Sequence, residues 1–185
     1  SAGMLAHLEI KKAPTVGHFW RFAGLDPTVI WEKKQKRPWN AKLKVLVWKA
    51  TESFVKFQNH DDDFYGSLYR TRKDYELHRN ETGELADQAK AVLEAKRIGQ
   101  DTEAYKWYSQ GKLPPAHIHA RATRWTGKMF LSHIHHAMHV DVFGKEPVKP
   151  FGLEKVPGDH RHFVALPNWP FDDWAEGKSL VDMGE

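Results

Sequence analysis

The segment from His18 to Pro27 reads HFWRFAGLDP, and the basic run from Lys33 to Arg37 follows shortly after it. Its apolar residues have helical spacing, and Gly24 suits the left-handed conformation in which helices end. Asp26-Pro27 then blocks further helix, because the residue before a proline avoids helical dihedral angles. The segment therefore predicts a short helix over residues 16–23 that stops before a cluster of cations.

The charge distribution beyond this helix is one-sided. Seven Lys or Arg lie between Glu32 and Lys49, and Glu32 is the only acid among them. The whole chain is nearly balanced, with 28 basic and 24 acidic residues. A local excess of one sign favours a polyanionic partner. The expected phosphate contacts in this region are Lys33, Lys34, Lys36, Arg37, Lys42 and Lys44.

Length and composition set the outer limits. A chain of 185 residues with 41% hydrophobic residues is long enough for one domain with a packed core. The chain has no long uncharged apolar run, so the sequence predicts no membrane helix, and we expect no signal peptide. The absence of cysteine excludes disulfides, thiolate zinc sites and thiol nucleophiles, and it fits a cytoplasmic location.

Hydrophobic periodicity predicts a mainly α-helical fold. We expect helices at 2–9, 16–23, 41–57, 64–79, 84–97, 101–108 and 116–143, and an extended segment at 28–31. The expected N-caps are Thr15, Asn40, Asp101 and one residue of 61–63. Residues 1–144 are expected to form a helical nucleic-acid-binding domain. Residues 145–185 are expected to form an irregular, aromatic-rich arm packed on it.

The long helix predicted at 116–143 carries a second basic pattern. At 100° per residue, seven of its polar positions fall within roughly 80° of one another. They are His117, Arg121, Arg124, Lys128, Ser132, His135 and His139. This row has no acid, whereas helix surfaces normally mix both signs, so it predicts a second set of phosphate contacts. The alternative is an ordinary solvated face that lacks acids.

The histidines also raise the possibility of a metal site. His135 and His139 are four residues apart, a spacing that lets two imidazoles share one ion. The sequence shows no third ligand for them and no HExxH pattern, so hydrogen-bonded or solvated histidines are the ordinary alternative. The acidic run 61–63 has the same two interpretations, a magnesium site or a helix cap. We expect no cofactor.

Aromatic residues flank the basic run on both sides. Phe19, Trp20, Trp31 and Trp39 either stack on unpaired bases or serve as core anchors. The chain lacks a GxSxG elbow, a glycine-rich phosphate loop and a dinucleotide fingerprint. The sequence therefore favours binding over catalysis for this chain alone.

Residues 1–57 resemble the C-terminal domain of insertion-sequence transposases of the IS-one-ten group. In that family a helix-hairpin-helix leads to a helix that ends on a phrase like Phe22–Pro27. A basic segment and a helix like 40–57 follow. Residues 1–8 resemble the second helix of that hairpin, so the resemblance implies a partial helix-hairpin-helix. Residues 65–69 and 115–121 look like a transposase variant met in phage and prophage genomes.

The resemblance implies DNA binding without strand chemistry. The family's acidic nuclease domain is not in this chain, and its serine-bearing, glycine-rich stretch is replaced by residues 31–38. No catalytic residue is carried over. Three hypotheses follow: a DNA-binding or, less expected, RNA-binding domain of a transposase-like mobile-element or phage protein; a metal-dependent nuclease or hydrolase; and a phage protein that binds a host protein through its C-terminal arm.

Overall fold

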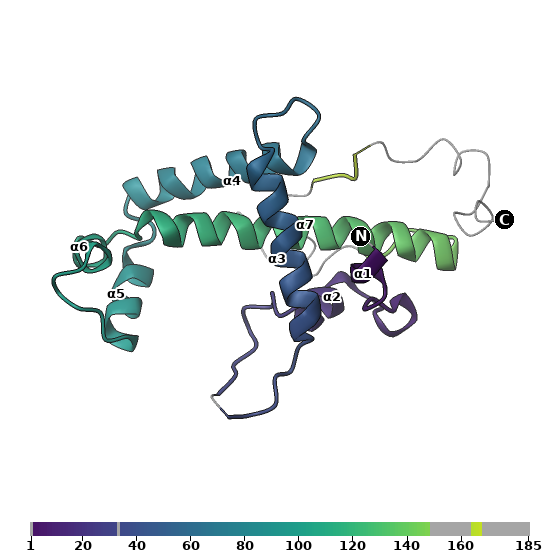
Figure 1. Cartoon of the computed structure of the whole chain (residues 1–185), viewed down its shortest axis with the longest axis horizontal. Helices are drawn as coiled ribbons and strands as arrows, with labels where there is room; N and C mark the ends of the chain where they lie inside the picture. Colours follow the sequence, from purple (N-terminus) through teal and green to yellow (C-terminus); the bar gives the residue numbers. More distant parts are fainter. Residues whose placement is uncertain (1, 33, 149–163, 168–185) are drawn as a thin grey trace. The chain divides into compact units, whose positions relative to one another are not determined.

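The computed structural model describes residues 2–32, 34–148 and 164–167. Within these residues the chain forms seven α-helices and one 3-10 helix, and no strand (Figure 1). The expectation of a mainly α-helical fold is confirmed. The elements are α1 (Ala2–Leu5), η1 (Ile10–Lys12), α2 (Val16–Phe22), α3 (Ala41–Lys56), α4 (Phe64–Glu81), α5 (Ala86–Ala95), α6 (Glu103–Ser109) and α7 (Pro115–Phe143).

Two expected elements differ. The helix expected at 2–9 ends at Leu5, and His7 N donates to Met4 O at 3.0 Å in a tight turn instead of continuing the helix. The extended segment expected at 28–31 forms no strand. The Asp26 carboxylate accepts hydrogen bonds from the backbone N–H and the hydroxyl of Thr28, at 2.9 and 2.7 Å. This side-chain turn places Thr28, the first residue of the segment predicted to be extended, in a turn at the exit of α2.

Two of the expected caps are confirmed. Asn40 Oδ1 accepts from Leu43 N at 3.0 Å at the start of α3, and Asp63 Oδ1 accepts from Gly66 N at 2.9 Å at the start of α4. Thr15 precedes α2 without a side-chain cap bond, and its hydroxyl lies 3.0 Å from His18 Nδ1 instead. The cap of α6 is Thr102 rather than the residue before it.

The chain folds as two compact units. Unit 1 comprises Ser1–Lys49 and Gly127–Glu185, and unit 2 comprises Ala50–Thr126. The boundary at residue 144 that the sequence suggests stays a prediction, because most of residues 145–185 lie outside the described part. That part of the chain contains no helix of the length and apolar character needed to cross a membrane.

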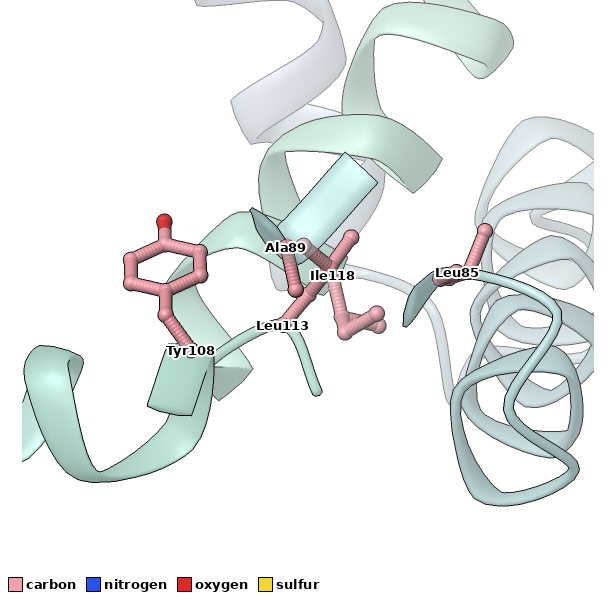
Figure 2. Packing of buried hydrophobic residues seen from close by; sticks show 5 residues of the cluster. All are labelled: Leu85, Ala89, Tyr108, Leu113 and Ile118. Atoms are coloured by element: carbon pink, nitrogen blue, oxygen red, sulfur yellow. The ribbon is translucent and has the colours of Figure 1, made fainter. Parts of the chain in front are cut away.

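Unit 2 has a small apolar core of its own. Figure 2 shows Ala89, Leu113 and Ile118 meeting where α5, the α6–α7 connection and α7 come together, with Leu85 and Tyr108 at the edges. The side chain of Asn80 on α4 anchors this connection. It accepts from Leu113 N at 2.8 Å and donates to Leu113 O at 3.0 Å, and both residues are buried. A buried backbone segment outside regular structure is thus fully hydrogen-bonded.

Unit 1 depends on the junction between α2 and α3. Gly24 ends α2 with a φ of +68°. A Cβ added there would lie 2.9 Å from Trp39 Cγ and 3.1 Å from Lys44 Cδ. The backbone N–H of Asn40 donates to Phe22 O at 2.8 Å. The start of α3 is therefore fastened to the end of α2 by a backbone hydrogen bond and by direct packing.

We expect Gly24→Ala to lower the free energy of unfolding of unit 1 by about 2–4 kcal/mol. The left-handed conformation costs a residue with a Cβ roughly 1–2 kcal/mol, and the clash with Trp39 adds about 1–3 kcal/mol. Gly144→Ala is the matched control, because Gly144 has a φ of +64° with no atom within 4 Å of the added Cβ. Chemical denaturation followed by tryptophan fluorescence measures both, and equal losses would contradict the packing argument.

Candidate nucleic-acid interface

The loop between α2 and α3 carries exposed cations on a braced backbone. Lys34, Lys36 and Arg37 are all exposed. The indole N–H of Trp31 donates to Gln35 O at 2.9 Å, which holds the loop together locally. Figure 1 shows this connection extending past the N-terminal end of α3. Lys33 lies outside the described residues, so its predicted role stays a prediction.

Helix α3 continues the basic character. Lys42 and Lys49 are exposed and two helical turns apart, on a different side of the helix from the buried Leu43 and Val47. Lys44 is also exposed, and its Nζ lies 4.7 Å from the centroid of the Trp39 ring. Lys49 was not among the predicted phosphate contacts. Its seven-residue spacing from Lys42 was the available signal.

A second basic group lies near the exit of α2. Lys128 Nζ lies 5.1 Å from the centroid of the Trp20 ring, and the Trp20 indole N–H donates to Lys128 O at 3.2 Å. Arg21 is exposed nearby. Burial raises the pKa of the Asp26 carboxyl, but the hydrogen bonds from Thr28 and the charges of Lys128 and Arg21 outweigh it and lower that pKa.

These residues define one candidate interface in unit 1. Gly24 lies close to Lys44, and the carboxylate of Asp26, two residues later, feels the charges of Lys128 and Arg21. The two basic groups therefore both border residues 24–26 at the exit of α2. We call the described cations around it the basic surface. Its members are Arg21, Lys34, Lys36, Arg37, Lys42, Lys44, Lys49 and Lys128.

The polar row expected along α7 is not a continuous solvent-facing surface, and Arg121 shows why. Its Nε donates to Glu76 Oε2 at 2.7 Å, and its Nη1 donates to Gln88 Oε1 at 2.6 Å. Glu76 is fully buried on α4, where Arg72 also donates to it at 2.5 Å. Leaving a buried carboxylate without its cation is costly. Arg121 is therefore committed to the interior of unit 2.

The histidines of the row are also turned inward. His135 is 1% exposed and donates to Ala13 O at 2.8 Å, and His139 is 7% exposed and donates to Lys145 O at 2.9 Å. The expectation that both face a phosphate backbone is wrong, because their imidazoles fasten separate stretches of backbone to α7. His117 is half-buried beside the Tyr108 hydroxyl at 3.1 Å. Arg124 remains exposed in unit 2.

Among the described residues, the predicted metal pair His135 and His139 has no third ligand. The rings of His135 and His139 lie 5.8 Å apart between centroids, with one nitrogen of each bonded to a backbone carbonyl. Across the described ranges 2–32, 34–148 and 164–167, no three His, Asp or Glu side chains form a group that could hold a metal ion. The observed geometry favours the hydrogen-bonding interpretation of these histidines.

A chain of titratable groups in unit 2 escaped the sequence analysis. His119 Nδ1 lies 2.7 Å from the Tyr69 hydroxyl, and His119 Nε2 lies 3.6 Å from Glu52 Oε1. Such an order resembles a catalytic relay, but Tyr69 is only 2% exposed and both imidazole nitrogens face protein groups. The chain connects α3, α4 and α7 within unit 2. Sequence gave no signal because the three residues are far apart along the chain.

Comparisons of the chain with models of protein families, with curated proteins and with solved structures found no match.

The buried Glu76 predicts acid sensitivity in unit 2. Burial raises the pKa of its carboxyl, but the hydrogen bonds and charges of Arg121 and Arg72 outweigh burial, so the folded-state pKa lies below the usual value of about 4.3. The carboxylate therefore stabilises the fold above that value, and the contribution is lost as pH falls through the folded-state pKa. We expect Glu76→Gln to cost about 3–5 kcal/mol at neutral pH and to flatten the acid limb of stability.

Urea denaturation of unit 2 at several pH values between 2 and 7 measures this effect. Glu84→Gln is the matched control, since Glu84 is an exposed acid that pairs with Arg79. We expect the control to leave stability nearly unchanged. An acid limb in Glu76→Gln as steep as that of the natural protein would refute the role of this carboxylate.

His135 predicts a loss of stability in unit 1 that begins at a higher pH than the loss expected from Glu76. Burial lowers the pKa of its imidazole, and the hydrogen bond to the Ala13 carbonyl offsets only part of that effect. The neutral form is favoured in the fold, so stability is complete above the unfolded pKa of about 6.5 and falls as pH drops below it. The slope contributed by one such histidine is at most about 1.4 kcal/mol per pH unit.

We expect His135→Gln to reduce the pH dependence of unit 1 stability between pH 7.5 and 5.5, because glutamine does not titrate. Exposed His18 on α2 provides the control variant His18→Gln, which should retain most of the dependence because the charge of His18 is only a minor cause of the lowered pKa of His135. Thermal melting at matched ionic strength measures both. Identical slopes for the natural protein and His135→Gln would contradict the assignment.

Proposed function

We propose that this chain is a domain that binds nucleic acid, with DNA as the expected partner, and that it has no catalytic activity by itself. It would form part of a transposase-like mobile-element or phage protein. The observation that carries the proposal is the basic surface of unit 1. The sequence resemblance over residues 1–57 supports the same class of partner. A cytoplasmic location belongs to the proposal as well.

The segment from Arg21 to Lys49, which holds most of the basic surface, has many more cations than acids. From Arg21 to Lys49 the sequence has eight Lys or Arg and two acids, Asp26 and Glu32. Asp26 accepts two hydrogen bonds from Thr28, and Glu32 accepts from the Gln35 side chain at 3.0 Å. Asp26 also feels the charges of Lys128 and Arg21, but two acids against eight cations leave a local excess of positive charge that attracts a polyanion.

The contrast with unit 2 supports this assignment. There, Arg72, Arg79 and Arg121 all lie within ion-pair distance of Glu76. Among the described residues, no ion pair within 4.0 Å involves Lys34, Lys36 or Arg37. Exposed cations of this kind contribute little to stability, whereas each phosphate contact releases counterions.

We expect the combined variant Lys34→Gln, Lys36→Gln, Arg37→Gln to bind duplex DNA at least about tenfold more weakly near 0.1 M salt. Three lost phosphate contacts should lower the slope of log K against log salt by about 2.7, at about 0.9 for each contact. Fluorescence anisotropy with a labelled duplex at several salt concentrations measures affinity and slope together, and circular dichroism checks the fold.

The matched control removes three exposed cations from unit 2, as Lys90→Gln, Lys96→Gln, Arg97→Gln. This control changes the net charge by the same amount, so it separates a local interface from a general charge effect. It should keep most of the affinity and slope. Equal losses in the two variants, or unchanged binding in the first, would overturn the proposed interface.

A further inference from the structure

Three tryptophans of unit 1 each hold a cation against the ring. Lys44 lies 4.7 Å from the Trp39 centroid, and Lys128 lies 5.1 Å from the Trp20 centroid. The guanidinium of Arg37 lies 5.9 Å from the Trp31 centroid. Trp31 and Trp39 also contact each other edge to face, with centroids 5.8 Å apart. All three cations belong to the basic surface.

From this arrangement we infer that the basic surface binds the phosphate backbone of a DNA duplex, and that its tryptophans orient cations instead of stacking on unpaired bases. The inference rests on the proposed function and deepens it, because it names the form of nucleic acid that the surface accepts.

The surroundings of the rings disfavour base stacking. A stacked base needs an open ring face, and aromatic residues in single-strand binding proteins supply one. Here Trp39 packs closely over the backbone of Gly24 and carries Lys44. The indole N–H groups of Trp20 and Trp31 are bonded to carbonyls of the protein. Each ring is thus held by contacts with the protein, and a base could stack on the face that the cation occupies only by displacing that cation.

The same contacts favour a rigid, highly charged partner. A lysine or arginine resting on an aromatic ring has lost part of its rotational freedom before binding, so less entropy remains to be lost when it meets a phosphate. A duplex carries one charge per roughly 1.7 Å of axis and stays straight over about 150 base pairs. A single strand offers a lower charge density and must itself be ordered on the surface.

Helix α3 adds a fixed spacing to this array. Lys42 and Lys49 are seven residues apart on one helix, which places their Cα atoms about 10.5 Å apart along its axis. Lys44 lies between them in sequence, and Trp39 at the start of α3 holds its ammonium group. Cations held at fixed positions by a helix and by aromatic rings suit a duplex, because the spacing of its phosphates is also fixed.

The test compares one labelled duplex of about 16 base pairs with each of its two strands, using the full chain at several salt concentrations. We expect the duplex to bind about tenfold more tightly than either strand at the same salt, with the steeper salt slope. Equal or tighter binding of a single strand would overturn the inference. This comparison needs no variant, so it holds whatever the substitutions below do to folding.

Two substitutions then separate orientation from stacking. Lys44→Gln removes a charge and keeps the ring, so it should weaken duplex binding and reduce the salt slope by about 0.9. Trp31→Leu removes the ring beneath Arg37 and keeps every charge, so duplex affinity should fall only about two- to threefold with an unchanged slope. A loss of at least about fivefold that is confined to the single strands would indicate base stacking and contradict the inference.

The outcomes also distinguish this inference from the proposed function. Absence of salt-dependent binding to duplex and strands alike would refute both. Salt-dependent binding that prefers single strands would leave the nucleic-acid-binding function in place and refute only the duplex assignment. Duplex preference with the expected responses of the two variants would support both.

Discussion

The close packing of Trp39 and Lys44 against the backbone of Gly24 is the constraint on which unit 1 depends. Only a residue without a Cβ fits this junction in its left-handed conformation. With Trp39 in place, the backbone N–H of Asn40 reaches Phe22 O, and the Asn40 side chain caps α3. The helix that carries Lys42, Lys44 and Lys49 of the basic surface therefore begins where the preceding helix allows it to begin. Fold and candidate site share one local cause.

Polar residues on α7 are used in a different way. A periodicity argument groups residues by their angle around a helix, and Arg121, His135 and His139 do share that angle. What surrounds them depends on partners far away in sequence: Glu76 for Arg121, and backbone carbonyls for the two imidazoles. An acid-free row is therefore poor evidence for a free surface when its countercharge comes from another helix. The sequence does not show that Glu76 is the partner of Arg121, because a glutamate on a helix such as α4 is ordinarily expected to be exposed.

Local signals explain most of what the sequence predicted correctly. The bounds of α3 and α7 follow from apolar spacing and from Asn40 and Pro115, which act within one helical turn. The N-terminal helix is shorter than predicted, because a tight turn at His7 ends it, and an Asx turn at Asp26 includes the first residue of the segment predicted to be extended at 28–31. For the site, Lys34, Lys36, Arg37, Lys42 and Lys44 are exposed as the sequence predicted. Their aromatic partners required coordinates, because ring contacts depend on how the loop folds back.

The tryptophans show why composition alone leaves function open. Aromatic residues interleaved with cations fit two opposite roles, since the same ring either offers a face to a base or offers it to a lysine. The structure places Lys44 and Lys128 over such rings and ties two indole N–H groups to the backbone. A ring used in this way keeps a cation extended and partly desolvated. The attraction of the surface for a polyanion then depends on cations held at fixed positions as well as on their number. Unit 2 differs, because three of its arginines lie within ion-pair distance of the one buried carboxylate of Glu76. Their charge is therefore partly neutralised within the fold.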